Sequence, residues 1–184
     1  LHPAVADLLD LLELERLDRR LFRGRNEAAG GERLFGGQVL GQALRAAAGT
    51  VEGRRPHSLH GYFLRPGRHD HPVIYDVDLL RDGRTFTTRR VVALQHGEAI
   101  FSTAVSFQTP PETSPPDEGG AIEYGEAPPA WPDPETLRDD AAIARERWGQ
   151  DPNVMPWQAR ERPFEVRSVY PFGTRPGSAP VKPA

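Results

Sequence analysis

The sequence has 184 residues, a formal net charge of −3 and a pI near 6.1. The length suits one domain or slightly more, and 38% hydrophobic with 27% charged residues is a globular composition with fewer apolar residues than average. The sequence contains no basic block, no cysteine and no apolar run of 18 residues. These features exclude nucleic-acid binding by a basic patch, disulfide or thiolate chemistry and a spanning helix, and we expect a cytoplasmic protein.

The N-terminal residues 3–20 are predicted to form an amphipathic helix, because leucines recur at helical spacing and acidic residues fall between them. Pro3 suits the first turn of such a helix. A short strand and an irregular loop are expected to follow, before the next apolar stretch begins.

The stretch RLFGGQVLGQALRAAAG, residues 33–49, predicts a buried helix over about 37–49 that ends at Gly49. Small and apolar residues occupy most sides of this helix, which is the pattern expected when a curved sheet encloses it. Gly37 and Gly41 lie on one face and predict close approach of a neighbouring backbone. Gly36 and Gly37 also leave backbone N–H groups at the helix start open to a carbonyl oxygen or an anion.

After this helix the hydrophobic period changes to two, which is typical of strands. Strands are predicted within residues 56–67, 72–83, 84–97 and 98–110. Asp82-Gly83 and His96-Gly97 have the composition of tight hairpin turns. The sequence therefore predicts an antiparallel sheet that packs on the buried helix.

The remaining chain divides into two further parts. Residues 1–109 form the first predicted domain, and residues 110–162 are a predicted linker with a short helix from about Asp133 to Gly149. Asp133 is the expected N-cap of that helix. Residues 163–184 are interpreted as the first strand of a second, incomplete domain.

Two histidines in HSLHG are candidate functional residues. They are three residues apart on a predicted strand, so His57 and His60 are expected on opposite faces. His57 is predicted to share the face of Gly61, next to the helix, and is the candidate general base because imidazole titrates near neutral pH. A hydrogen-bonded structural role is the alternative. The substrate-binding candidates are Gly36, Gly37, Gln38 and His60.

No metal site is predicted. His69-Asp70-His71 lies in a loop and lacks a third ordered ligand, so we expect a solvated turn there. The Gln38 side chain could contact substrate or could form core hydrogen bonds.

Five segments in collinear order resemble the N-terminal half of the type II (TesB-like) acyl-CoA thioesterases. They are LFRGRNE, FGGQVLGQAL, HSLHGYFLRPG, IYDVDLLRDGRTFTTRRV and AIFSTAVSFQ. The resemblance implies an α+β hotdog fold, in which an antiparallel sheet wraps a long helix, as the first half of a double hotdog. Residues 1–109 would be that first hotdog, and the strand expected from residue 163 would begin the second.

The resemblance also implies hydrolysis of acyl-CoA to a fatty acid and CoA, without a cofactor, metal or covalent intermediate. The family's water-positioning Asp, Thr and Gln lie in its second hotdog, so we expect them in a C-terminal half outside this sequence. Phe35-Gly36-Gly37-Gln38 has no carboxylate, and backbone donors of Gly37 or Gln38 would stabilise the oxyanion.

Two interpretations of the whole chain follow from these residues. The first is an acyl-CoA thioester hydrolase of fatty acid metabolism that takes acyl-CoA and forms a homo-oligomer through its hotdog sheets. The alternative is a non-catalytic acyl-CoA-binding or assembly module.

Four arginines could contact CoA phosphates or could simply be solvated. They are Arg81, Arg84, Arg89 and Arg90.

Overall fold

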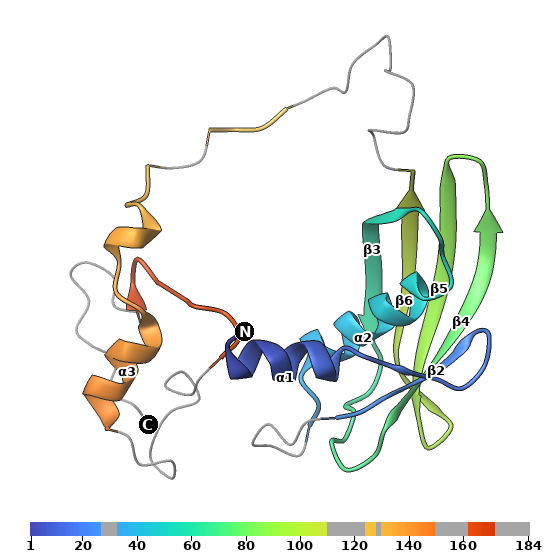
Figure 1. Cartoon of the computed structure of the whole chain (residues 1–184), viewed down its shortest axis with the longest axis horizontal. Helices are drawn as coiled ribbons and strands as arrows, with labels where there is room; N and C mark the ends of the chain where they lie inside the picture. The colour runs from blue at the N-terminus through green and yellow to red at the C-terminus, as the bar shows by residue number, and fades with distance from the viewer. Residues whose placement is uncertain (27–32, 110–123, 128–129, 150–161, 172–184) are drawn as a thin grey trace. The chain divides into compact units, whose positions relative to one another are not determined.

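The computed structural model of the chain describes residues 1–26, 33–109, 124–127, 130–149 and 162–171. The chain divides into two compact units. One unit, residues 8–121, contains a β-sheet and the helix packed on it (Figure 1). The other unit consists of residues 1–7 and 122–184.

The sheet is antiparallel and has six strands in the order β1-β2-β4-β5-β6-β3. The strands are β1 (Glu15–Arg16), β2 (Leu21–Gly24), β3 (Arg55–Phe63), β4 (Val73–Asp82), β5 (Phe86–Gln95) and β6 (Glu98–Gln108). Strands β4, β5 and β6 are successive hairpins, whereas β3 pairs with β6 instead of its sequence neighbour β4. Within the described residues, β3 is therefore an edge strand.

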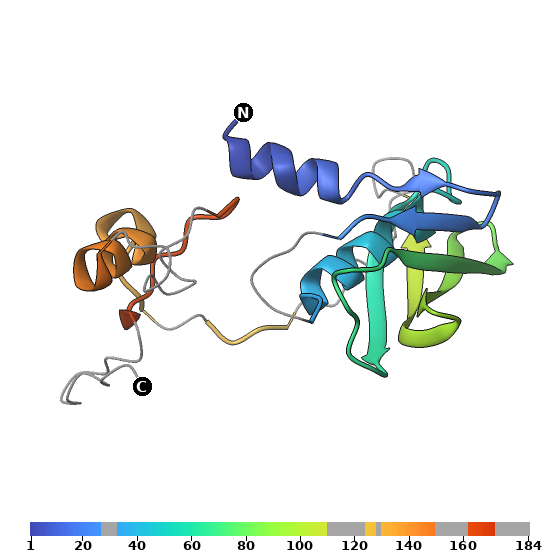
Figure 2. The same ribbon diagram turned by 90° about the horizontal axis from the view of Figure 1, so that it is seen from below.

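Helix α2 (Gly36–Ala48) packs on one face of the sheet. Figures 1 and 2 show it running across the strands, and it contacts β2, β4, β5 and β6. Its buried alanines face inward-pointing side chains that alternate along the strands. The main inward-facing residues are Val73, Tyr75, Val77, Val91, Phe101, Val105 and Phe107. Because alanine side chains are small, α2 lies close to the sheet. The predicted α+β hotdog arrangement is confirmed.

Both predicted hairpins are present, but the first turns over residues 83–85 with Asp82 inside β4, so only the second is a two-residue turn. His96 has φ 51° and Gly97 has φ 78°, which are the positive values that a tight two-residue hairpin requires. At the other hairpin, the Gly83 N–H donates to Phe86 O over 2.9 Å. These turns set the register that places alternate residues of β4, β5 and β6 against α2.

The N-terminal helix is shorter than predicted. Helix α1 spans Pro3–Leu11, and the prediction that it extends to residue 20 is wrong. Residues 15 and 16 form β1 and pair with β2, where Arg23 Nε donates to Glu15 Oε2 over 2.7 Å. Leu17 follows β1 and is 43% exposed, so it does not take part in an apolar helix face.

The close backbone approach occurs at Gly61 and not at the helix glycines. A Cβ at Gly41 would meet the Leu12 side chain, and one at Gly37 would meet the Phe35 ring, so the predicted backbone contact is wrong. A Cβ at Gly61 would lie 2.9 Å from the Ser102 carbonyl oxygen and 2.7 Å from the Phe101 ring. β3 can therefore lie this close to β6 and the core only with glycine at residue 61.

The second unit differs from its prediction in two ways. The single helix expected from Asp133 to Gly149 is two elements, the 3₁₀ turn η2 (Pro134–Thr136) and α3 (Asp140–Trp148). Each has its own cap: Asp133 accepts from the Glu135 N–H, and Asp139 accepts from the Ala142 N–H over 2.9 Å. None of the described helices is long and apolar enough to cross a membrane.

The strand expected from residue 163 is absent from residues 162–171. This segment binds α3 instead, since the Asp140 N–H donates to Val166 O and Ser168 binds the Asp140 carboxylate. A strand needs a neighbour for its backbone groups, and here the start of a helix takes that place. Most of the predicted linker, together with residues 172–184, lies outside the described residues, and the division into domains stays a prediction.

Candidate functional site

The start of α2 presents open backbone donors. Phe35 occupies the N-cap position, and its side chain cannot accept a hydrogen bond. Among the described residues, nothing accepts from the Gly36 and Gly37 N–H groups, whereas the Gln38 N–H donates to Phe35 O over 3.1 Å. The donors available at this helix start therefore belong to the two glycines and not to Gln38.

The Gln38 side chain forms core hydrogen bonds. It is 8% exposed, and its Nε2 donates to Asn26 Oδ1 over 2.9 Å and to Arg25 O over 3.2 Å. These bonds attach the segment that follows β2 to α2. Of the two roles open to this residue, the geometry favours core hydrogen bonding over substrate contact.

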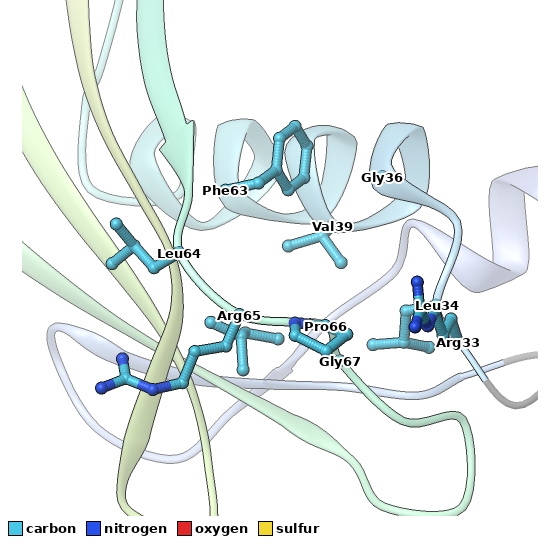
Figure 3. Close-up of a pocket in the computed structure, with 10 residues that line it drawn as sticks. Arg33, Leu34, Gly36, Val39, Phe63, Leu64, Arg65, Pro66 and Gly67 are labelled. Atoms are coloured by element: carbon cyan, nitrogen blue, oxygen red, sulfur yellow. The ribbon is translucent and has the colours of Figure 1, made fainter.

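A pocket of about 530 Å³ opens beside the start of α2. Figure 3 shows that its lining comes from the helix start, the residues before it and the chain that leaves β3. The side chains of this α2 pocket are mostly apolar, namely Leu34, Val39, Phe63, Leu64, Pro66 and Ile100. Arg33, Arg65, Gly36 and Gly67 complete the lining. The pocket is open to solvent, since Phe63 and Leu64 of its lining are largely exposed.

The two candidate histidines lie on the outer face of the sheet, away from α2. A bulge between Pro56 and Ser58 makes His57 the inserted residue, and its Nε2 lies 2.8 Å from Ser106 Oγ. The prediction that His57 shares the face of Gly61 is therefore wrong, because a bulge breaks the alternation of side chains. His60 lies on the same outer face, and its ring centroid is 5.0 Å from that of Tyr62.

The sheet thus separates the predicted site residues into two groups. Gly36, Gly37 and Gln38 lie on the inner face with α2, and His57 and His60 lie on the outer face. His57 has the hydrogen bond that its structural alternative requires. Its role as a general base stays a prediction without a catalytic partner in the described residues.

The other charged residues considered above, Asp70, His71 and Arg90, form hydrogen bonds or ion pairs with nearby residues. Arg68 binds the Asp70 carboxylate through Nε and Nη2, and these bonds, with a further one from His71, hold the pKa of Asp70 well below its usual range. No group of three metal-ligating side chains occurs in the described part of the chain. Arg90 pairs with Asp78 on the outer face.

A set of buried polar residues was not predicted from the sequence. Arg89 is 3% exposed and donates to the Thr50 hydroxyl, the Asp82 carboxylate and three backbone carbonyls. Gln95 binds the loop at Arg68 and His71. The available signal was their alternation with Val91 and Ala93 along β5, which places them on the buried face.

Comparisons with known proteins agree with this arrangement. Residues 25–108 match the acyl-CoA thioesterase N-terminal domain family. Acyl-CoA thioesterase 2 of Haemophilus influenzae is 39% identical over 166 residues, which cover 89% of this chain and 55% of that protein. Acyl-coenzyme A thioesterase 8 of Homo sapiens is 40% identical over 170 residues, covering 88% of this chain and 51% of that protein.

Among solved structures, the tesB protein of Mycobacterium avium subspecies paratuberculosis is similar with a TM-score of 0.64 and 38% identity. That match covers 72% of this chain and 50% of the tesB protein. The chain spans about half the length of the curated relatives that it matches. It therefore belongs to the type II acyl-CoA thioesterase family and carries the N-terminal hotdog of that family's double hotdog fold.

Proposed function

We propose that this chain is the N-terminal half of an acyl-CoA thioester hydrolase, which converts acyl-CoA to a fatty acid and CoA. The observation that carries the proposal is the match of residues 25–108 to the thioesterase N-terminal domain, over the same residues that form α2 and the sheet. The names of the two curated relatives support the same activity.

The reaction needs a water, a base and an oxyanion site. Water adds to the thioester carbonyl carbon, the carbonyl oxygen takes negative charge, and the C–S bond then breaks as CoA leaves and takes up a proton at sulfur. The Gly36 and Gly37 N–H groups are suited to stabilise such an oxygen, because they are unpaired within the described residues and lie at the positive end of a helix.

The base is proposed to come from outside this chain. The segment from Phe35 to Gln38 carries no carboxylate, and none lines the α2 pocket. The start of α2 has hydrogen-bond donors but no base. This supports a mechanism in which this half binds the thioester and the C-terminal half activates the water.

The free edge of β3 is the proposed contact with a second hotdog. An edge strand presents unpaired backbone groups, and Tyr62, Phe63 and Leu64 at its end are 65%, 60% and 50% exposed. Apolar side chains beside an open edge favour strand addition by a neighbouring sheet. We propose that either the C-terminal half of the same polypeptide or a second copy pairs here. Pairing of two copies through their hotdog sheets would make the protein a homo-oligomer.

The test measures CoA release with a thiol reagent from acyl-CoAs of short, medium and long chain length. The natural full-length polypeptide is expected to release CoA, and the 184-residue chain alone is expected to release none above background. Binding of acyl-CoA by the full-length protein without release at any chain length would favour the non-catalytic binding module. The cytoplasmic location and the role in fatty acid metabolism stay predictions.

A further inference from the structure

Two histidine rings from different elements meet beside the turn between β5 and β6. His71 lies in the loop before β4, and His96 is the first residue of the β5–β6 turn. Their ring centroids are 4.1 Å apart, and their planes are inclined by 64°. Both residues are exposed, so a ligand from solvent can reach the pair. The proposed hydrolysis uses neither residue.

The loop that carries His71 is fixed to the strand that leads to His96. Gln95 is buried and directly precedes His96 in the chain. Its Nε2 donates to His71 O over 2.6 Å and to Arg68 O over 2.7 Å, and its Oε1 accepts from the Arg68 N–H over 2.8 Å. Asn26 Nδ2 also donates to His71 O. One amide side chain therefore sets the spacing of the two histidines, which lowers the entropic cost of a ligand that joins them.

Asp70 orients the His71 ring. The Asp70 Oδ1 lies 3.0 Å from His71 Nδ1, and Arg68 binds the same carboxylate through Nε and Nη2. A hydrogen bond from Nδ1 to a carboxylate leaves the Nε2 lone pair for another ligand. Metal-binding imidazoles commonly have such a carboxylate behind them, because it fixes the tautomer and raises the basicity of the other ring nitrogen.

A pocket of about 340 Å³ beside the two rings has room for an ion and its waters. Its lining includes both histidines together with Pro72 and Leu94. Two imidazoles that share one ion at a metal–nitrogen distance of about 2.1 Å have centroids roughly 5 Å apart. The exposed His96 ring can reach that spacing by a small rotation about χ2. Water would complete the coordination shell, since the Gln95 amide is occupied by its backbone partners.

We infer that His71 and His96 form a binding site for one divalent transition-metal ion, held by His71 Nε2 and a ring nitrogen of His96. Imidazole suits Zn²⁺, Ni²⁺ and Cu²⁺, whereas Mg²⁺ and Ca²⁺ prefer oxygen ligands. Two protein ligands are fewer than a permanent zinc site has, so we expect an exchangeable ion. No metal site was predicted from the sequence, because the loop at residues 69–71 lacked a further ordered ligand, which the fold supplies as His96.

Calorimetric titration of the 184-residue chain without an affinity tag, with ZnCl₂ and separately with MgCl₂, tests the inference. One Zn²⁺ is expected to bind per chain, and Mg²⁺ is expected not to bind. His71→Asn and His96→Asn should each abolish saturable Zn²⁺ binding, with circular dichroism to verify the fold. Asparagine suits the positive φ of residue 96, so the turn is kept. His60→Asn is the matched control, because His60 is exposed and its ring packs against Tyr62, and it should leave the affinity unchanged.

Asp70→Ala tests the orientation of the His71 ring. Its Zn²⁺ affinity is expected to fall about tenfold, as is usual when the carboxylate behind an imidazole ligand is removed. Nitrogen-15 spectra of the imidazoles should show Zn²⁺ shifting Nε2 of His71 in the parent chain, and a loss of the preference for a proton on Nδ1 in Asp70→Ala.

Four results would overturn the inference. They are absence of saturable Zn²⁺ binding, equal affinity for Mg²⁺, binding that persists in both His71→Asn and His96→Asn, and an equal loss in His60→Asn. A stoichiometry of one Zn²⁺ per two chains would also overturn it, because the ion would then join two copies instead of two residues of one chain. None of these readouts depends on CoA release, so the proposed hydrolysis and this site are tested separately.

Discussion

The Tyr75 hydroxyl donates a 2.7 Å hydrogen bond to Oε1 of Gln42, and both side chains are fully buried between α2 and the sheet. The Nε2 of Gln42 donates to Leu11 O over 2.7 Å and to Arg25 O over 2.8 Å. One side chain of α2 therefore connects β4, the end of α1 and the residue after β2. Every polar atom of this amide has a partner, as a buried amide requires.

Tyr75→Phe is expected to destabilise the fold by about 1–3 kcal/mol, because Gln42 Oε1 would stay buried without a donor. Urea unfolding followed by circular dichroism measures the change. Tyr62→Phe is the matched control, since Tyr62 is 65% exposed and should lose almost nothing. Equal midpoints for the two variants would contradict the role of the buried bond.

The same phenol predicts a loss of stability at alkaline pH. Burial raises the pKa of Tyr75 above its usual range, so the folded state keeps the proton that the unfolded state releases above about pH 10. Stability is then fully present below that pH and falls by about 1.4 kcal/mol per pH unit above it. Denaturant titrations between neutral and alkaline pH should show a shallower decline in Tyr75→Phe than in the parent chain.

Arg89→Lys is expected to destabilise by about 2–4 kcal/mol, because lysine cannot reproduce the fork that binds both Thr50 and Asp82 in a buried position. Asp82 is 61% exposed, so Asp82→Asn should cost less than about 1 kcal/mol. Thermal unfolding of both variants measures the difference. A loss as large in Asp82→Asn would mean that the ion pair, and not the buried fork, carries the stability.

Acid titration gives a second readout for this pair. The hydrogen bond from Arg89 is the main cause that lowers the pKa of Asp82. A lowered carboxyl pKa adds stability above the unfolded value of about 3.9, and that stability is lost as pH falls through the folded value. Asp82→Asn should therefore show a smaller decline in unfolding midpoint below about pH 4.

Gly61→Ala is expected to destabilise by about 1–3 kcal/mol, because the new Cβ would meet the Phe101 ring and the Ser102 carbonyl. Gly125→Ala is the control, since nothing lies within 4 Å of the position of its Cβ. Differential scanning calorimetry compares the two melting temperatures. A melting temperature of Gly61→Ala equal to that of the control would show that β3 can move away from β6 at little cost.

His57→Ala in the full-length protein is expected to keep CoA release within about twofold, because His57 binds Ser106 on the face opposite α2 and a surface hydrogen bond contributes only about 0.5–1.5 kcal/mol of stability. Steady-state kinetics across pH 6–9 checks this. A large fall in kcat with loss of a limb of the pH profile would restore His57 as the general base.

The central fold was predictable because its signals are local. Alternation along β4 and β6, the turns at Asp82-Gly83 and His96-Gly97, and the small residues of α2 all predict the same arrangement. The end of α1 was not predictable in this way. Leucines continue at helical spacing to residue 21, but α1 ends at Leu11 and residues 15 and 16 pair with β2.

The candidate site was predicted less well, because faces depend on register. The bulge at His57 moves one side chain across the sheet, and no sequence feature of HSLHG marks it. The Gly36 and Gly37 donors were predictable from composition, whereas the occupied Gln38 N–H depends on the conformation of Phe35. Alternation along β5 could have placed Arg89 and Gln95 on the buried face, but their partners Thr50 and Arg68 are distant in sequence and could not be predicted from it.

The two edge strands of the sheet, β1 and β3, differ in length and in charge. At one end β1 has only two residues, both exposed and charged, and Glu15 is paired with Arg23. At the other end β3 has nine residues and its outer backbone edge is open in the described part of the chain. Short charged edges resist further pairing, so the sheet can extend in one direction only. Pairing of two such units through β3 would therefore be self-terminating, because the two open edges would close each other.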